Sequence, residues 1–187
     1  RVVFAAVGSE QPTGWEGKSL GEVQQLLDMP LEDAVAHILL ETKLQALMIY
    51  HWPKERVGEL KRTFQHSVHM VSTDGVYVGD KPHPRGFGTY PRVLGECVRK
   101  NGWLTLEQAI YKMTGLPALT FQIAKRGTIR EGNFADLVIF DADEIIDTAT
   151  FEQPRQAPKG IDYVLVNGKI VLDHGQILDG LHGELIT

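Results

Sequence analysis

Apolar residues in the first third of the chain occur both in short continuous runs and at helical spacing. Each of the two runs has the length of a strand buried on both faces, and Gly8 ends the first run. Between the runs, Ser19 followed by Glu22 predicts a capping box at the start of one helix, and Pro30 predicts the start of another. The predicted elements are strands at residues 2–7 and 44–50 and helices at residues 19–27 and 31–39.

The same alternation continues through the middle of the chain. Pro53 begins a predicted helix, residues 68–72 have the pattern of a strand closed by Thr73-Asp74-Gly75, and Thr105 caps a later helix. A loop rich in glycine and proline covers residues 75–88. Strands and helices in this order are typical of a parallel sheet with crossover helices. We therefore expect an α/β fold that contains the C-terminal strands and helices of a (β/α)8 TIM-type barrel. Helical spacing occurs at residues 57–64, 93–98 and 106–113.

The pattern changes at Gly127, where short β-rich runs begin to alternate with turns. The dipeptide Asn167-Gly168 between two such runs is a strong hairpin signal. We therefore predict two domains, with the barrel portion at residues 1–124 and a small antiparallel β unit at residues 125–187. The β-rich runs are residues 127–130, 136–140, 163–166 and 169–172.

The charge and the cysteine content indicate which kinds of molecule the protein is expected to bind and where it is expected to be located. The formal charge of −5 is spread along the chain without a run of like charge, so neither nucleic acid nor a membrane surface is an expected partner. No stretch approaches the ~20 apolar residues that span a bilayer. A single cysteine, Cys97, can form neither an internal disulfide nor a thiolate metal cage, which favours a cytoplasmic location and a packing or surface role. Because the chain opens directly on a strand without a methionine, we expect it to be a fragment of a longer protein.

Asp74 is the leading candidate for chemistry. It follows the predicted strand at residues 68–72, and catalytic groups of a parallel barrel lie where the C-terminal ends of strands meet the following loops. The alternative is a turn without chemistry, because an aspartate before a glycine is a common loop signal.

The loop after Asp74 carries two further candidates, His83 and Arg85. Pro82 and Pro84 stiffen the backbone around them, and the planar guanidinium of Arg85 can bind a carboxylate through two parallel hydrogen bonds. The alternative for both residues is a solvated loop in which a local ion pair forms with Asp80.

The other histidines are weaker candidates. His51 ends the predicted strand at residues 44–50 on the same barrel face as Asp74, so it could reach a pocket, whereas Trp52 is expected to be a packing residue or a pocket wall. His69 would lie roughly 16 Å from Asp74 on one extended strand, at ~3.3 Å per residue, and the two cannot share a metal. His37, His174 and His182 are expected at the surface. The sequence contains no His-x-His or His-Glu-x-x-His pattern, no phosphate-binding glycine loop and no Gly-x-Ser-x-Gly motif.

Several segments together resemble the amidohydrolase superfamily and, within it, the N-acyl-D-amino-acid deacylase (D-aminoacylase) branch. Residues 127–141 (GTIREGNFADLVIFD) and 164–169 (VLVNGK) resemble the strands that the superfamily adds to a small β-sandwich beside its barrel. The branch is indicated by segments that span most of residues 65 to 175. These are residues 72–75 (STDG), 83–95 (HPRGFGTYPRVLG), 106–114 (LEQAIYKMT) and 149–152 (ATFE).

The resemblance implies a barrel that binds one or two zinc ions, with Asp74 at the end of the eighth strand. In such enzymes this aspartate accepts a proton from the attacking hydroxide and then gives it to the leaving amine, and it is also a candidate metal ligand. Arg85 would hold the α-carboxylate of an N-acyl-D-amino acid, and His83 would shape the same loop. The family's main zinc ligands come from earlier strands, which are not in this chain. Thr73 stands where the family usually has serine.

Two other functions stay open at this point. One is hydrolysis of a cyclic amide, as in hydantoinases and dihydroorotases, although the His83-Pro84-Arg85 loop argues against it. The other is a noncatalytic binding or scaffold module. For the leading hypothesis we expect the isolated chain to be inactive, with the missing N-terminal half of the barrel as its partner, because five strands and the metal ligands are absent.

Overall fold

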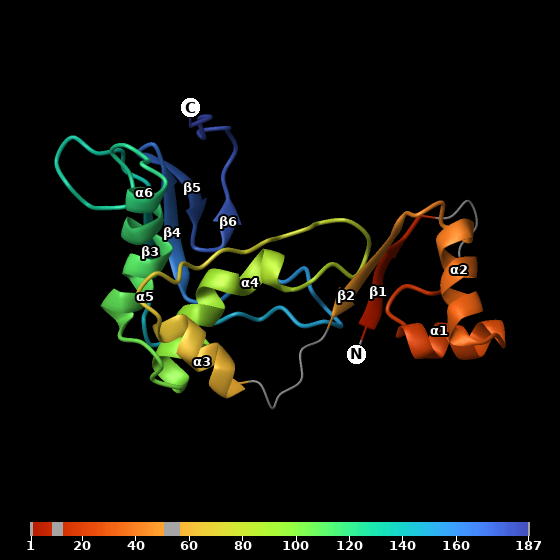
Figure 1. Ribbon diagram of the computed structural model, residues 1–187. Coiled ribbons are helices and arrows are strands. Elements are labelled where there is room, and N and C mark those ends of the chain that lie inside the picture. Colours follow the sequence, from red (N-terminus) through yellow and green to blue (C-terminus); the bar gives the residue numbers. More distant parts are fainter. Residues whose placement is uncertain (1, 9–12, 51–56, 187) are drawn as a thin grey trace. The chain divides into compact units, whose positions relative to one another are not determined.

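The chain forms helices, two small sheets and long segments without regular structure (Figure 1). The computed structural model describes residues 2–8, 13–50 and 57–186. Contacts divide the chain into two compact units. One consists of Arg1–Arg56, Asp74–Phe87 and Ala149–Gln156, and the other of Val57–Thr73, Gly88–Thr148 and Ala157–Thr187. The predicted α/β class is therefore confirmed.

Two helices of the first unit begin where the sequence predicts. The Ser19 side chain accepts a hydrogen bond from the Glu22 N–H at 3.3 Å, and the Glu22 carboxylate accepts one from the Ser19 N–H at 2.6 Å. This capping box satisfies backbone donors that would otherwise lack a partner, and it starts α1 (Leu20–Leu27). Pro30 caps α2 (Leu31–Glu41), where its missing N–H is not needed.

The two strands of this unit, β1 (Val2–Val7) and β2 (Ala46–Tyr50), pair antiparallel, with Val2 opposite Tyr50 and Val7 opposite Ala46. The predicted parallel arrangement is wrong for this pair. A parallel neighbour would have to start beside the start of β1. Instead the chain re-enters at the far end of β1, where the Gly8 N–H donates to the Gln45 carbonyl at 2.9 Å.

The helices are held to β1 by a small apolar core. Phe4 and Val23 are completely buried, and Trp15 and Ile38 are nearly so. The Phe4 and Trp15 rings lie 6.3 Å apart, centre to centre. Burial of these large apolar side chains stabilises the packing of the helices against β1.

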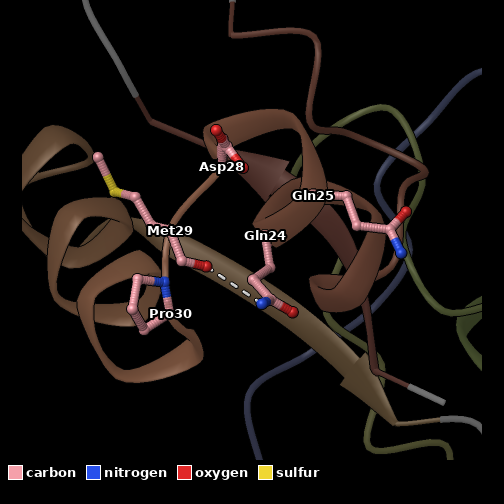
Figure 2. A pocket seen from close by; sticks show the side chains of 5 residues that line it. All are labelled: Gln24, Gln25, Asp28, Met29 and Pro30. Atoms are coloured by element: carbon pink, nitrogen blue, oxygen red, sulfur yellow. Dashed lines mark hydrogen bonds between the residues drawn. The ribbon is translucent and has the colours of Figure 1, made fainter.

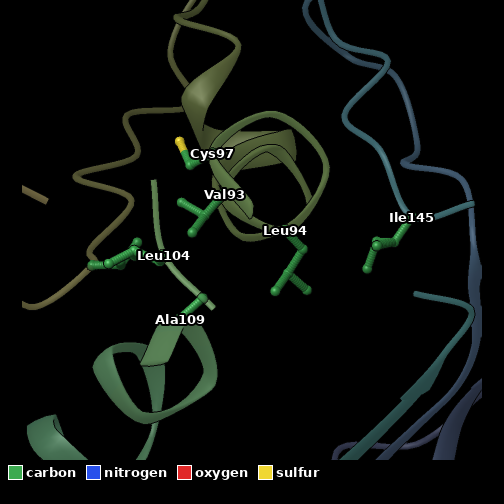
Figure 3. Close-up of a cluster of buried hydrophobic side chains, with 7 residues drawn as sticks. Val93, Leu94, Cys97, Leu104, Ala109 and Ile145 are labelled. Carbon is green, nitrogen blue, oxygen red and sulfur yellow. The ribbon is translucent and has the colours of Figure 1, made fainter. Parts of the chain in front are cut away.

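The second unit is built around another apolar cluster, shown in Figure 3. Thr105 caps α5 as predicted, and the structure adds that it forms a capping box with Gln108. An α-helix that contains Pro91 continues directly into a π-helical segment, η2. Because proline lacks an N–H, it interrupts the ladder of hydrogen bonds shortly before the winding changes. The helices of the second unit are α3 (Val57–Gln65), η2 (Val93–Lys100), α5 (Leu106–Met113) and α6 (Gly115–Thr120), and α4 (Arg85–Arg92) begins in the first unit and ends in the second.

Residues 68–72 do not form the predicted strand. A strand requires a neighbouring strand with which to share hydrogen bonds. Here the Val71 N–H donates instead to the carbonyl of Lys112 at 3.2 Å. The Lys112 ammonium, which is almost fully buried, in turn donates to the carbonyls of His66 and His69. A helix therefore supplies the hydrogen bonds that a second strand was expected to supply.

The predicted antiparallel β unit is present as a four-stranded sheet in the order β3-β4-β5-β6. Asn167 and Gly168 form its central hairpin turn, and both have the positive φ values, 49° and 78°, that a type I′ turn requires. Residues 127–130, which were predicted to be β-rich, do not belong to the sheet. The strands are β3 (Leu137–Phe140), β4 (Ile161–Val166), β5 (Lys169–Asp173) and β6 (Gln176–Ile177).

The predicted domain bounds, residues 1–124 and 125–187, refer to a complete enzyme and stay a prediction. None of the helices in the described part of the chain has the length and hydrophobicity needed to cross a lipid bilayer.

Cys97 has a packing role, because its side chain lies in the apolar cluster of the second unit and is 8% exposed. Burial raises the pKa of the thiol from 9.0 to about 11. The nearby charge of Arg92 lowers this pKa, and that of Glu96 raises it. At pH 8 the thiolate fraction should therefore be about 100-fold lower in the folded protein than in the unfolded chain. We predict that iodoacetamide labels Cys97 about 100-fold more slowly in buffer than in urea. Equal rates would show that the thiol is not buried.

Candidate functional site

Asp74 lies at the start of a segment without regular structure in the first unit. Its backbone has φ of 43°, in the left-handed region that aspartate tolerates better than most residues. Its side chain is 80% exposed. The backbone of Asp74 therefore has a conformation typical of loops, and its carboxylate is accessible to a small molecule.

Arg85 binds Asp74 through two different atoms. The Arg85 Nη2 lies 2.6 Å from Asp74 Oδ2, and the Arg85 Nε donates to the Asp74 backbone carbonyl at 3.0 Å. The ion pair thus forms with Asp74 and not with Asp80, the partner considered from the sequence. Arg85 is also the first residue of α4, so the prediction that it lies in a loop is wrong. Pro84 explains the difference, because proline is favoured at helix starts.

His83 orients the same backbone. Its Nδ1 accepts a hydrogen bond from the Arg85 N–H at 3.0 Å, as a capping side chain does at a helix start. The His83 ring also meets the Phe151 ring edge to face, with centroids 5.1 Å apart. The structure therefore brings together Asp74, His83 and Arg85, three of the residues predicted from the sequence.

Two aromatic residues, Tyr77 and Phe87, pack together beside the backbone that follows Arg85. The Tyr77 hydroxyl donates to the carbonyl of Gly86, the residue after Arg85, at 2.9 Å. The Tyr77 and Phe87 rings pack edge to face at 5.4 Å. Phe87 lies in the segment 83–95 that resembles the family, but Tyr77 belongs to no motif, so only its packing identifies it.

The loop is anchored to β1 at an irregularity in the strand. The register of β1 shifts between Phe4 and Ala6, and the Ala5 carbonyl accepts a hydrogen bond from the Lys81 N–H at 3.3 Å. A bulge of this kind directs a backbone group away from the sheet. Gly79, with φ of 77°, lies so close to Ala5 and Ala6 that a side chain would have no room.

The remaining predicted candidates do not join this group. His51 lies outside the described residues, so its predicted role stays a prediction. His69 belongs to the other unit, where its ring packs against that of Phe64, with centroids 4.7 Å apart and the planes tilted by 40°. Burial, together with the nearby charge of Lys112, lowers the pKa of His69 below its usual range. His69 is therefore a packing residue.

No three His, Cys, Asp or Glu side chains come together as a metal site in residues 2–8, 13–50 and 57–186. A structural or catalytic zinc ion usually needs at least three protein ligands. Asp74 could supply one, but its carboxylate is bound by Arg85. These residues do not form a zinc site by themselves.

A shallow depression lies at the junction of α1 and α2 (Figure 2). The amide nitrogen of Gln24 donates to the Met29 carbonyl across it at 3.1 Å. It contains none of the predicted site residues, and its polar groups are those of an ordinary helix connection. Its lining residues are Gln24, Gln25, Asp28, Met29 and Pro30.

Known proteins resemble this chain in sequence and in fold. The family model of the amidohydrolase family matches residues 2–172. The chain belongs to the amidohydrolase family. Its crystallographic neighbours include the N-acyl-D-glutamate deacylase of Bordetella bronchiseptica, with a TM-score of 0.86 and 37% identity over 99% of this chain and 37% of that one. That enzyme was crystallised with zinc and a phosphonate inhibitor that mimics the tetrahedral intermediate of its reaction.

Curated relatives point to the same branch of the family. The N-acyl-D-glutamate deacylase of Alcaligenes xylosoxydans xylosoxydans is 50% identical over 111 residues, which are 59% of this chain and 23% of the relative. The N-acyl-D-aspartate deacylase of the same organism is 39% identical over 157 residues, 84% of this chain and 30% of the relative. The predicted resemblance to N-acyl-D-amino-acid deacylases is confirmed. The chain spans less than a third of the length of these curated relatives.

The contact between Gly79 and β1 gives a prediction about stability. Gly79→Ala should lower the free energy of unfolding by about 3 kcal/mol, because the substitution combines an unfavourable positive φ with a clash against backbone. Gly132 is a matched control, since its φ is 83° and no atom lies within 4 Å of the position that a Cβ would take there. Gly132→Ala should cost only about 1 kcal/mol. Urea denaturation of both variants measures the free energies of unfolding. Equal losses in the two variants would mean that the loop is not in close contact with β1 at Gly79.

Proposed function

We propose that this chain is part of an enzyme that hydrolyses the amide bond of N-acyl-D-amino acids, releasing a carboxylate and a D-amino acid. The observation that carries the proposal is the pairing of the exposed Asp74 carboxylate with the Arg85 guanidinium. It joins a proton acceptor to a carboxylate-binding group within one loop. The substrate class is supported by the similarity to deacylases of N-acyl-D-glutamate and N-acyl-D-aspartate.

In the proposed reaction Asp74 carries one proton. The oxygen of a water molecule bonds to the amide carbonyl carbon while Asp74 accepts a proton from that water. The carbon–nitrogen bond then breaks, and Asp74 returns the proton to the departing nitrogen, which leaves as the amine. A carboxylate suits both steps because it is restored at the end of each cycle.

Arg85 would bind the α-carboxylate of the substrate. The Arg85 and Asp74 side chains are 41% and 80% exposed. An ion pair this exposed contributes no more than about 1 kcal/mol, so a carboxylate of the substrate can compete for the guanidinium. Binding would then place the acyl group beside the carboxylate that Arg85 has partly released. His83, which fixes the backbone of Arg85, would keep the guanidinium in position.

The complete enzyme would be larger than this chain. We propose that residues 1–124 belong to a (β/α)8 barrel and residues 125–187 to a small β-sandwich. Zinc is the proposed cofactor, by analogy with the Bordetella enzyme. Asp74 would be one ligand, and the others would come from elsewhere in the protein. The expected cytoplasmic location rests on the single cysteine.

The first test of the proposal concerns activity and Asp74. The full-length protein should release the D-amino acid from N-acetyl-D-amino acids and leave the L-enantiomers intact, as measured by chromatography of the free amine. Asp74→Asn should reduce kcat by about 1,000-fold, because the amide keeps the shape but cannot carry the proton. Zinc content, measured by atomic emission, should stay near the wild-type value, because the other proposed ligands come from elsewhere in the protein. A variant with near wild-type turnover would rule out the proton-carrying role.

A second test concerns Arg85. Arg85→Ala should raise KM by about 30-fold, since a hydrogen-bonded charge pair contributes about 2 kcal/mol. Arg85→Lys keeps the positive charge but lacks the planar guanidinium, so its KM should lie between those of the wild type and Arg85→Ala. The matched substrate is an N-acetyl amine that lacks the carboxylate, for which wild type and Arg85→Ala should have similar KM values. Equal increases for both substrates would show that Arg85 does not bind the carboxylate.

A further inference from the structure

A segment far along the chain lies against the loop that carries the candidate site. Ala149–Gln156 belongs to the same compact unit as Asp74–Phe87. The intervening residues, Gly88–Thr148, belong to the other unit. We call residues 149–156 the strap. The strap contains no regular structure, so its contacts with the loop depend on individual side chains.

Arg155 makes the central contacts of the strap. Its Nη2 donates to the backbone carbonyl of Gly79 at 2.9 Å and to that of Tyr77 at 3.3 Å. Its guanidinium carbon lies 5.7 Å from the centre of the Phe87 ring, within the range of a cation–π contact. One side chain therefore satisfies two carbonyls of a loop that has no partner strand there, and it also covers an aromatic ring.

Two further contacts join the strap to the loop. The ammonium of Lys81 donates to the Glu152 carbonyl at 2.5 Å. The Phe151 ring packs on His83, the residue that binds the backbone N–H of Arg85. The strap thus touches the loop in the middle and near its C-terminal end.

These contacts lead from Arg155 to Arg85 in a few steps. Arg155 holds the Tyr77 carbonyl, and the Tyr77 hydroxyl holds the carbonyl of Gly86, next to Arg85. Phe87 lies between the Tyr77 ring and the Arg155 guanidinium. Loss of Arg155 would remove the hydrogen bonds to the Tyr77 and Gly79 carbonyls and the contact with Phe87. The backbone that precedes and follows Arg85 would then be held less firmly.

We propose that Arg155 is a positioning residue for the reaction and that the strap fixes the loop in the geometry that binds substrate. The inference rests on the proposed deacylase function, since it assigns Arg155 a role at that same site. Small displacements of a binding group can reduce rates by up to ~100-fold even when the substitution lies outside the reacting atoms. Arg155 itself does not touch the substrate.

The test combines kinetics with hydrogen exchange on the full-length protein. Arg155→Ala should raise KM for an N-acetyl-D-amino acid about tenfold and lower kcat several-fold. Backbone amides of residues 75–87, followed by mass spectrometry, should exchange about tenfold faster. Arg155→Lys can still donate to the two carbonyls and should recover part of both effects. Arg130→Ala is the control, because Arg130 is an exposed arginine in an irregular segment of the other unit, and it should change neither measurement.

Kinetics and exchange together distinguish a positioning role of Arg155 from a purely structural one. Faster exchange of residues 75–87 together with a raised KM supports the inference. Unchanged exchange in Arg155→Ala overturns it, and so does faster exchange with unchanged KM and kcat, because the contact would then be structural only. If the wild-type protein cleaved no N-acyl-D-amino acid, the proposed function would fail by itself. Exchange would then still decide whether Arg155 holds the loop.

Discussion

The candidate site depends on how the backbone of residues 74–87 satisfies its hydrogen bonds. Within the described residues this segment is not part of either sheet, although it touches β1 at Ala5. Backbone carbonyls and amides left without partners away from water are costly. In this loop the groups are paired by side chains and by the edge of a bulged strand, through Arg155, Tyr77 and the Ala5 carbonyl. The loop is therefore ordered by contacts that can be removed one side chain at a time.

The order of the loop backbone also determines how Asp74 and Arg85 interact. Both residues are brought together by the path of the loop and by the helix start at Arg85, while their side chains stay accessible to solvent. An accessible pair on a fixed backbone can exchange partners at little cost. A substrate carboxylate would use this property, whereas a buried pair would oppose it. The backbone contacts keep the loop in one conformation, and the exposed side chains of Asp74 and Arg85 are available to react with or bind a substrate.

Local signals predicted much of the fold correctly. Ser19 with Glu22 and Thr105 with Gln108 start helices because capping needs only residues three positions apart. Asn167-Gly168 forms the hairpin because both residues accept positive φ. Asp74, His83 and Arg85 come together because only a short loop separates them. The family could also be recognised, since its motifs are contiguous in the sequence.

Features that join distant segments needed the tertiary structure. Residues 2–7 and 44–50 were recognised as strands, but their antiparallel direction follows from where the intervening helices return the chain. Val71 has the pattern of a strand residue, yet its N–H is bound by Lys112. Arg155 lies 76 residues from Gly79 and carries no motif, so its contact with the loop could not be read from spacing. Neighbouring residues were enough to specify the caps, the turn and the chemical groups of the site. Strand direction and the side chains that hold the loop were set by packing, because both depend on contacts between residues far apart in the chain.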